Sequence, residues 1–176
     1  MFIWISLLFA AASSQAQTTL HYINKNVAYA QTLMRENGIP ASVILAVAIH
    51  ESAAGTSKIA RNLNNHFGVK GKNSSTKIKS AYKGYDSVED SYDHFVGFML
   101  HKSAFNHLFE KYDEDDYVDW VKGIQRGGYA QSKLWPSKVI ALIKKYELFK
   151  YDKKPSTINN KSIQYLNTVL PLHKIK

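Results

Sequence analysis

The chain has 176 residues, 45% of them hydrophobic, which is enough for one sizeable core and leaves no room for two domains. It contains no cysteine, which excludes disulfides, thiol chemistry and cysteine-based metal sites. Its formal net charge of +9 comes without a zinc-finger, RNA-recognition or basic-helix signature, so nucleic acid is not expected as a partner, whereas an anionic wall polymer or a membrane surface is.

The N-terminus has the pattern of an export signal. Residues 2–12 are apolar apart from Ser6, a run too short to span a membrane, and Ser14, Gln15 and Ala16 supply small residues at a cleavage position. We expect residues 1–16 to be a signal peptide and the mature protein to be secreted or periplasmic. A retained apolar anchor is the alternative.

Two helices are predicted next. Residues 22–37 carry apolar residues at helical spacing and end at Gly38, a favourable helix stop: Ile23, Val27, Ala30 and Met34. The second helix has Pro40 in its first turn, where a missing N–H costs nothing, and ends at Glu51. Its apolar positions place Glu51 on the buried stripe: Ile44, Val47 and Ala48.

Glu51 is therefore a candidate general acid. A carboxyl beside apolar neighbours loses hydration, which disfavours its ionised form. By periodicity alone, a Glu that merely ends the helix and points to water is equally compatible. The segment that follows is rich in turn formers and side-chain amides, as in binding loops, and includes Gly55, Asn64, Asn65, Phe67, Gly68 and Gly71.

Three further helices are predicted downstream. The first covers residues 88–101, with Ser87 as its cap and Asp90 three places on. The others cover about 116–125 and about 135–147. Between these two, Gly127 and Gly128 allow a sharp turn that presents Tyr129 to a groove, although a packed tyrosine with a satisfied hydroxyl fits the same pattern.

Two patterns that suggest metal sites are interpreted otherwise. The acidic run Asp113–Asp116 is most simply a solvated loop that caps the next helix. His50-Glu51 lacks the second histidine of a zinc protease motif, because position 54 is Ala54. Residues 153–176 change to a polar composition and then regain apolar character, which predicts a linker and a short C-terminal tail.

Three stretches together resemble the glucosaminidase domains of glycoside hydrolase family 73, found in flagellar and autolysin-type enzymes of bacterial cell walls. They are ILAVAIHESAAGTSKIARNLNNHFGVKG at 44–71, YKGYDSVEDSYDHFVGF at 82–98, and WVKGIQRGGYAQSKLWPSKVIALIKKYELFKYD at 120–152. The resemblance implies a mainly α, lysozyme-like, two-lobed domain over residues 17–152, with a groove for a peptidoglycan strand. We expect no cofactor and no metal, and a monomer.

Residue by residue, the resemblance implies roles for the motif positions. Glu51 matches the catalytic acid and Tyr129 the tyrosine of the GYA motif that faces it. Substrate-binding positions would be those of the NxFG run and of the YxxYxS-type segment: Asn65, Phe67, Gly68 and Tyr85. The implied activity is an endo-β-N-acetylglucosaminidase that cuts peptidoglycan after N-acetylglucosamine.

One departure from the family pattern affects the mechanism. Relatives usually have a longer hairpin with acidic residues between the positions of Gly71 and Tyr82, whereas this chain has KNSSTKIKSA, without Asp or Glu. A two-carboxylate mechanism then has Asp86 as the nearest candidate, although a turn or cap role is simpler for it. The alternatives are attack by the N-acetyl group of the substrate, lytic transglycosylase-type cleavage, or a catalytically weak peptidoglycan-binding relative. An effector aimed at another cell's wall would have the same residues.

Overall fold

The structure is a computed structural model that describes the backbone of residues 3–153 and the side chains of residues 16–153. This part of the chain is mainly helical, as predicted. Its elements are α1 (Ile3–Asn37), α2 (Ala41–Ser52), α3 (Lys58–Leu63), α4 (Val88–His101), α5 (Ser103–Lys111), α6 (Tyr117–Arg126), α7 (Trp135–Lys145) and the 3₁₀ helix η1 (Leu148–Tyr151). The predicted linker and tail lie outside the described residues, apart from Lys153.

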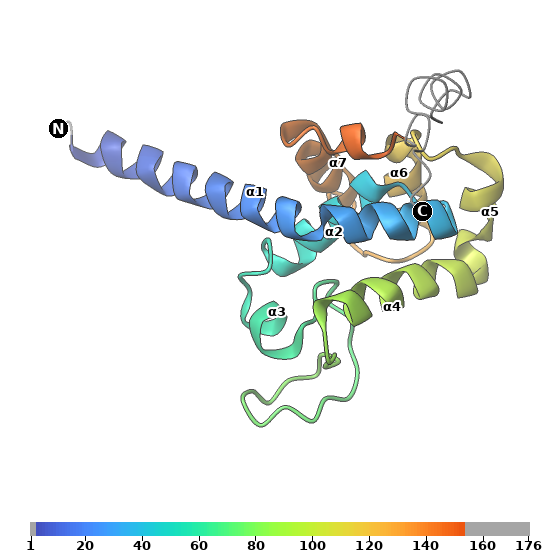
Figure 1. Cartoon of the computed structure of the whole chain (residues 1–176), viewed down its shortest axis with the longest axis horizontal. Coiled ribbons are helices and arrows are strands. Elements are labelled where there is room, and N and C mark those ends of the chain that lie inside the picture. The colour runs from blue at the N-terminus through green and yellow to red at the C-terminus, as the bar shows by residue number, and fades with distance from the viewer. Residues whose placement is uncertain (1–2, 154–176) are drawn as a thin grey trace, which may run out of the picture.

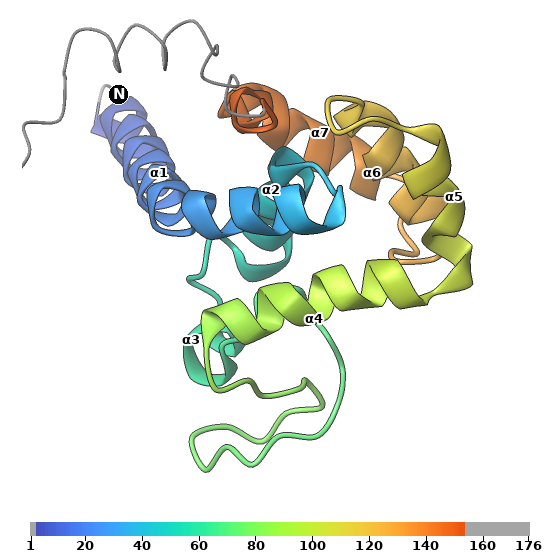
Figure 2. The same cartoon turned by 45° about the vertical axis from the view of Figure 1, so that its right-hand side comes forward.

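Helix α2 is the centre of the fold. Every residue from Ala41 to Ile49 is buried, as expected for a helix that is apolar all round rather than along one stripe. It packs against α1, α7 and η1 (Figures 1 and 2). Pro40 occupies the N-cap position and not the first turn, and the N–H of Ser42 is satisfied by the carboxylate of Asp152 at 2.7 Å.

The other predicted helices are present, and apart from the start of α1 their ends shift only slightly. Helix α4 begins and ends where predicted, and Ser87 and Asp90 form a capping box at its start. Helix α1 starts well before residue 22. Asp116 stands at the N-cap of α6, but its side chain makes no capping bond and instead accepts from the N–H of Asp113 at 3.1 Å.

The signal segment predicted at residues 1–16 coincides with the beginning of α1, except that residues 1–2 lie outside the described part. Figure 1 shows this end of the helix projecting away from the rest of the molecule. Among the residues that the structure describes, no helix is both long enough and apolar enough to cross a membrane.

The segment between α3 and α4 forms a short, irregular hairpin. Its arms meet in an isolated antiparallel bridge between Lys70 and Tyr82, and the amide of Asn73 ties the far arm with bonds of 2.8 Å to the carbonyls of Ser80 and Tyr82. In Figure 2 this hairpin and α3 lie on one side of α4, while α6 and α7 lie on the other. These two groups are the lobes of the molecule.

Candidate active site

A cavity of about 540 Å³ lies where the end of α2 meets α4, the loop after α3 and the start of α7. This volume is within the range of small-molecule sites. The residues that line it come from both lobes: His50, Glu51, Phe67, Gly68, Val69, Lys70, His94, Phe95, Phe98, Gly128, Tyr129, Ala130, Gln131, Ser132 and Trp135. Among these lining residues, Glu51 is the only one with a carboxylate side chain.

The Glu51 carboxyl group is held from two sides. The indole Nε1–H of Trp135 donates to Oε1 at 2.8 Å, and Trp135 is itself only 4% exposed, so the donor is fixed by packing. The other oxygen, Oε2, faces Gly68, where an added Cβ would lie 3.3 Å from it. Gly68 has a φ of +66°, which glycine adopts without strain, and its missing side chain keeps the space beside Oε2 open.

Tyr129 lies beside this carboxyl and closes one wall of the cavity. Its hydroxyl donates to the backbone carbonyl of Phe67 at 3.0 Å. The centroid of its ring lies 5.5 Å from the ring centroid of Trp135 and 5.6 Å from that of Phe95. Burial, with the charge of Glu51 adding to it, raises the pKa of Tyr129 well above its usual value. The phenol is therefore neutral, and its proton is engaged by the Phe67 carbonyl.

The loop that carries Phe67 and Gly68 is fixed from beneath by Asn65. This side chain is 1% exposed, donates to the carbonyls of Val69 and Lys83 at 2.8 Å each, and accepts from the N–H of Val69 at 3.1 Å. Asn65 does not line the cavity, whereas Phe67 does, with its ring stacked 4.5 Å from Phe95. Asn65 therefore shapes the site through the loop.

A buried polar cluster lies behind the same loop. The Tyr22 hydroxyl is 2.6 Å from Nδ1 of His66 and 2.9 Å from the Tyr92 hydroxyl. Burial lowers the pKa of His66 to about 4, and the charge of Lys25 adds to the effect. His66 is thus neutral at physiological pH and can accept the Tyr22 hydrogen through Nδ1.

Tyr85 reaches the cavity indirectly. Its hydroxyl lies 2.7 Å from Nδ1 of His94, and Lys83 Nζ lies 3.1 Å from the same nitrogen. His94 lines the cavity with Glu51, while Tyr85 lines a neighbouring one. Burial raises the pKa of Tyr85 to about 12, and burial with the charge of Lys83 lowers that of His94, so both groups are neutral near pH 7.

Asp86 lies outside the Glu51 cavity. It lines the neighbouring cavity of about 530 Å³ that is formed largely by the hairpin, and its backbone carbonyl accepts from the Asn64 amide at 3.0 Å. The structure thus brings Glu51, Tyr129, Phe67 and Gly68 together and keeps Asp86 apart from them.

Sequence reasoning missed Trp135 and His94 as cavity residues. Trp135 begins α7 directly before Pro136, a position that reads as an ordinary helix start. His94 lies on α4 between core positions, where a scattered histidine carries no signal of its own. One available signal was that residues 94, 95 and 98 share a helical face beside the predicted core stripe.

Comparison with known proteins assigns the chain to a family. Residues 27–148 match the glucosaminidase family model, described as mannosyl-glycoprotein endo-β-N-acetylglucosaminidase. The exo-glucosaminidase LytG of Bacillus subtilis is 27% identical over 150 residues, covering 74% of this chain and 52% of LytG. The peptidoglycan hydrolase FlgJ of Vibrio parahaemolyticus is 24% identical over 147 residues, covering 72% of this chain and 47% of FlgJ. The chain spans about half the length of these curated relatives.

Solved structures share the fold. The catalytic domain of the autolysin Auto from Listeria monocytogenes superposes with a TM-score of 0.64 at 24% identity, covering 76% of this chain and 87% of that domain. The glycoside hydrolase domain of Salmonella typhimurium FlgJ gives a TM-score of 0.61 at 19% identity, covering 86% and 97%. These neighbours confirm the expected mainly α, lysozyme-like fold. The family match covers well over half of the chain, so this protein belongs to the glucosaminidase family, as its resemblance to glycoside hydrolase family 73 predicts.

Proposed function

We propose that this protein is a peptidoglycan hydrolase, an endo-β-N-acetylglucosaminidase that cuts the glycan strand after N-acetylglucosamine with Glu51 as general acid. The observation that carries the proposal is the Glu51 carboxyl, held by Trp135 at 2.8 Å in a cavity lined by both lobes. Membership of the glucosaminidase family and the glucosaminidase activity for which LytG is named support the choice of bond, and the peptidoglycan hydrolase activity for which FlgJ is named supports the choice of polymer.

The hydrogen bond from Trp135 determines which oxygen of Glu51 delivers the proton. An indole N–H can only donate, so Oε1 acts as acceptor and the acidic proton resides on Oε2. Oε2 faces the space that Gly68 leaves open. The glycosidic oxygen would bind there, take the proton, and leave as its bond to the anomeric carbon breaks.

The second half of the reaction favours help from the substrate. Among the described residues that line the cavity, Glu51 is the carboxylate, and Asp86 lies in another cavity. The acetamido oxygen of the substrate would attack the anomeric carbon and form a cyclic oxazolinium ion, the recognised route for enzymes without a carboxylate nucleophile. Water then opens this ion at the anomeric carbon while the Glu51 carboxylate takes the water proton.

Tyr129 suits a role in that step. Its hydrogen is donated to the Phe67 carbonyl, so its oxygen has lone pairs left for an acceptor role. The acetamido N–H becomes more acidic as positive charge develops on the ring, and a tyrosine oxygen in the cavity wall could accept it. Tyr129 would thereby orient the acetamido group and stabilise the intermediate.

The direct test is analysis of reaction products. Purified peptidoglycan is digested, the products are reduced, and the new ends are identified by mass spectrometry. Reduced N-acetylglucosamine ends on oligosaccharides support the proposal, whereas anhydromuramic ends would assign lytic cleavage. Release of small saccharides from chain ends alone would assign exo cleavage, the activity for which LytG is named.

Glu51→Gln separates an enzyme from a binding protein. Gln keeps an oxygen that can accept from Trp135 but cannot donate a catalytic proton, so the rate should fall by about 10²- to 10⁴-fold while binding to cell walls persists. Equal, negligible rates for both proteins, with binding retained, would assign a peptidoglycan-binding role.

The site of action we propose is the cell envelope, after removal of residues 1–16 as a signal peptide. FlgJ of Vibrio parahaemolyticus is named as a peptidoglycan hydrolase, and the net charge of +9 favours retention on anionic wall polymers. We propose that the protein acts there as a monomer. N-terminal sequencing of the exported protein, with mature Gln17 as the expected first residue, tests the processing step.

A further inference from the structure

His94 lies at the wall between the Glu51 cavity and the cavity formed largely by the hairpin. This residue of α4 lines the first cavity, and Tyr85, whose ring centroid is 5.6 Å away in an edge-on arrangement, lines the second. The proposed roles of Glu51 and Tyr129 involve neither side chain. The contacts of His94 nevertheless fix one hydrogen-bond donor in the cavity wall.

The neighbours of Nδ1 determine which nitrogen of the His94 ring carries the hydrogen. Lys83 Nζ lies 3.1 Å from Nδ1, and the Tyr85 hydroxyl lies 2.7 Å from it. A lysine ammonium has three donors and no acceptor, so a hydrogen on Nδ1 would face a group that cannot accept it. Nδ1 is therefore the acceptor of the ring, and in the neutral imidazole the hydrogen is on Nε2.

The surroundings keep the ring in this neutral form. Burial lowers the pKa of His94, and the charge of Lys83 adds to the effect. The Lys83 ammonium also lies 5.2 Å from the centroid of the Tyr85 ring, so the three side chains form one compact group. Lys83 and Tyr85 thus hold the imidazole from the Nδ1 side.

The Nε2–H of His94 has no partner in the described part of the protein. Both hydrogen-bonding contacts of the side chain are made by Nδ1. Among the described residues, the buried side-chain polar atoms without a partner are the Ser42 hydroxyl and Oδ2 of Asp152, so Nε2 is not enclosed. Because His94 lines the cavity with Glu51, this N–H is available to a bound ligand.

We infer that His94 binds the substrate, with its Nε2–H donating to a neutral oxygen of the aminosugar strand, and that Lys83 and Tyr85 position it by keeping the ring hydrogen on Nε2. A neutral N–H donor suits the hydroxyl and acetamido oxygens of a sugar, which are neutral acceptors. Lys83 and Tyr85 are positioning residues, because neither lines the Glu51 cavity. The inference rests on the proposed function, since it concerns the same cavity.

The state of the ring can be measured without substrate, by NMR of the imidazole nitrogens in the ¹⁵N-labelled protein near pH 7. The signals of His94 are identified by their loss in His94→Gln. Nε2 should give the signal of a protonated nitrogen and Nδ1 that of an unprotonated one, and the reverse pattern would refute the inference. Lys83→Met removes the ammonium and keeps the aliphatic stem, so a mixture of the two tautomers should appear. An unchanged spectrum would exclude Lys83 as the positioning group.

Kinetics test the contact with substrate. A neutral hydrogen bond made in both the ground state and the transition state should be lost from KM, so His94→Ala should lower kcat/KM roughly 2- to 13-fold with kcat nearly unchanged. His94→Gln has an N–H at about the reach of Nε2 and should restore most of the loss. His94→Asn, whose amide reaches only as far as Nδ1, should not. His107→Ala, an exposed histidine of α5, is the matched control and should leave KM unchanged.

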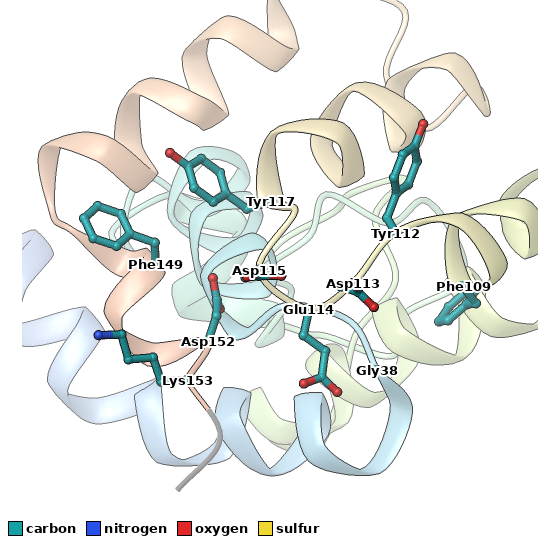
Figure 3. A pocket seen from close by; sticks show the side chains of 10 residues that line it. All are labelled: Gly38, Phe109, Tyr112, Asp113, Glu114, Asp115, Tyr117, Phe149, Asp152 and Lys153. Atoms are coloured by element: carbon teal, nitrogen blue, oxygen red, sulfur yellow. The ribbon is translucent and has the colours of Figure 1, made fainter. Parts of the chain in front are cut away.

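Tyr85→Phe tests the positioning role of the phenol. It removes the hydroxyl at Nδ1 and should raise KM by less than His94→Ala does, since Lys83 still contacts the ring. Tyr117→Phe is its control, because Tyr117 lines the separate cavity of about 870 Å³ that Figure 3 shows. Equal KM values in these two variants would refute a role for the Tyr85 hydroxyl.

A binding measurement separates this inference from the proposed hydrolysis. In the Glu51→Gln protein, which binds without turnover, adding His94→Ala should raise the Kd for soluble glycan strands of peptidoglycan by the same factor as KM. If the wild-type protein released no reduced N-acetylglucosamine ends, the proposed function would fail, and this Kd would still decide the role of His94. Equal Kd values with and without His94→Ala, or a kinetic loss confined to kcat, would overturn the inference.

Discussion

Replacing Trp135 with Phe tests whether the indole N–H controls Glu51, the proposed general acid. In the wild-type protein this group donates to Glu51 Oε1 at 2.8 Å, a distance typical of a bond to a charged acceptor. When Glu51 is protonated the bond is between neutral groups, and when the proton leaves Oε2 the acceptor becomes charged. The bond therefore strengthens along the reaction, and its loss should reduce kcat more than it raises KM.

The size of the effect follows from that change in strength. A hydrogen bond to a neutral group contributes about 0.5–1.5 kcal/mol and one to a charged group about 1.5–3 kcal/mol. The difference, about 1–1.5 kcal/mol, corresponds to a fall in kcat of roughly 5- to 13-fold.

Trp120→Phe is the matched control for this substitution. Trp120 is fully buried and its indole donates to the carbonyl of Asp113 at 3.0 Å, so the same change removes similar packing and one N–H bond outside the Glu51 cavity. Both variants should lose thermal stability, and only Trp135→Phe should lose kcat per folded molecule. Equal kcat in the two variants, or a loss confined to KM, would refute the reasoning.

Three other changes probe the loop and the cluster around the cavity. Gly68→Ala would place a Cβ 3.3 Å from Glu51 Oε2, at a backbone φ of +66°. Tm should therefore fall by a few degrees, and kcat in the reduced-ends assay should fall on the order of tenfold. Unchanged turnover would contradict the role of the open space beside Oε2. Asn65→Ala removes three buried hydrogen bonds and should lower the free energy of unfolding, measured by urea titration, by about 3 kcal/mol. A loss below about 1 kcal/mol would contradict the inference that Asn65 fixes the loop. The pKa of His66 falls from 6.5 to about 4 on folding, so the unfolded chain binds more protons than the folded one between these pH values. The contribution of His66 to the free energy of unfolding is therefore fully present above pH 6.5. It is lost as pH falls toward 4, by roughly 3 kcal/mol. His66→Gln should remove this slope from urea midpoints measured between pH 7 and 4, and equal slopes in the two proteins would exclude His66 as its cause.

Local sequence patterns were sufficient where the structure itself is local. The capping pair Ser87 and Asp90 sets the start of α4, and apolar spacing places Glu51 near the end of a buried helix. The shorter helices were not predicted, because they contain too few buried positions to show a helical period. Helix α3 has six residues, and α5 buries only Phe105 and Leu108.

The contacts that hold Glu51 and the first turn of α2 are long-range. Trp135 and Glu51 are 84 positions apart, and Asp152 and Ser42 are 110 apart. Neither pair leaves a periodic trace, because each depends on how α7 and η1 pack against α2 in the finished fold. The position of Asp86 also depends on the finished fold. Its backbone carbonyl accepts from the Asn64 amide, and the residue lines a different cavity from the one that contains Glu51.

The complete burial of α2 has a consequence for hydrogen exchange. Backbone amides in a helix enclosed on all sides reach deuterium only when the whole domain opens, so those of Val43 to Ile49 should be among the slowest to exchange in the molecule. Glu51, the proposed general acid, is thus attached to the segment that unfolds last. Loss of enzymatic function on heating should accordingly coincide with global melting and not precede it.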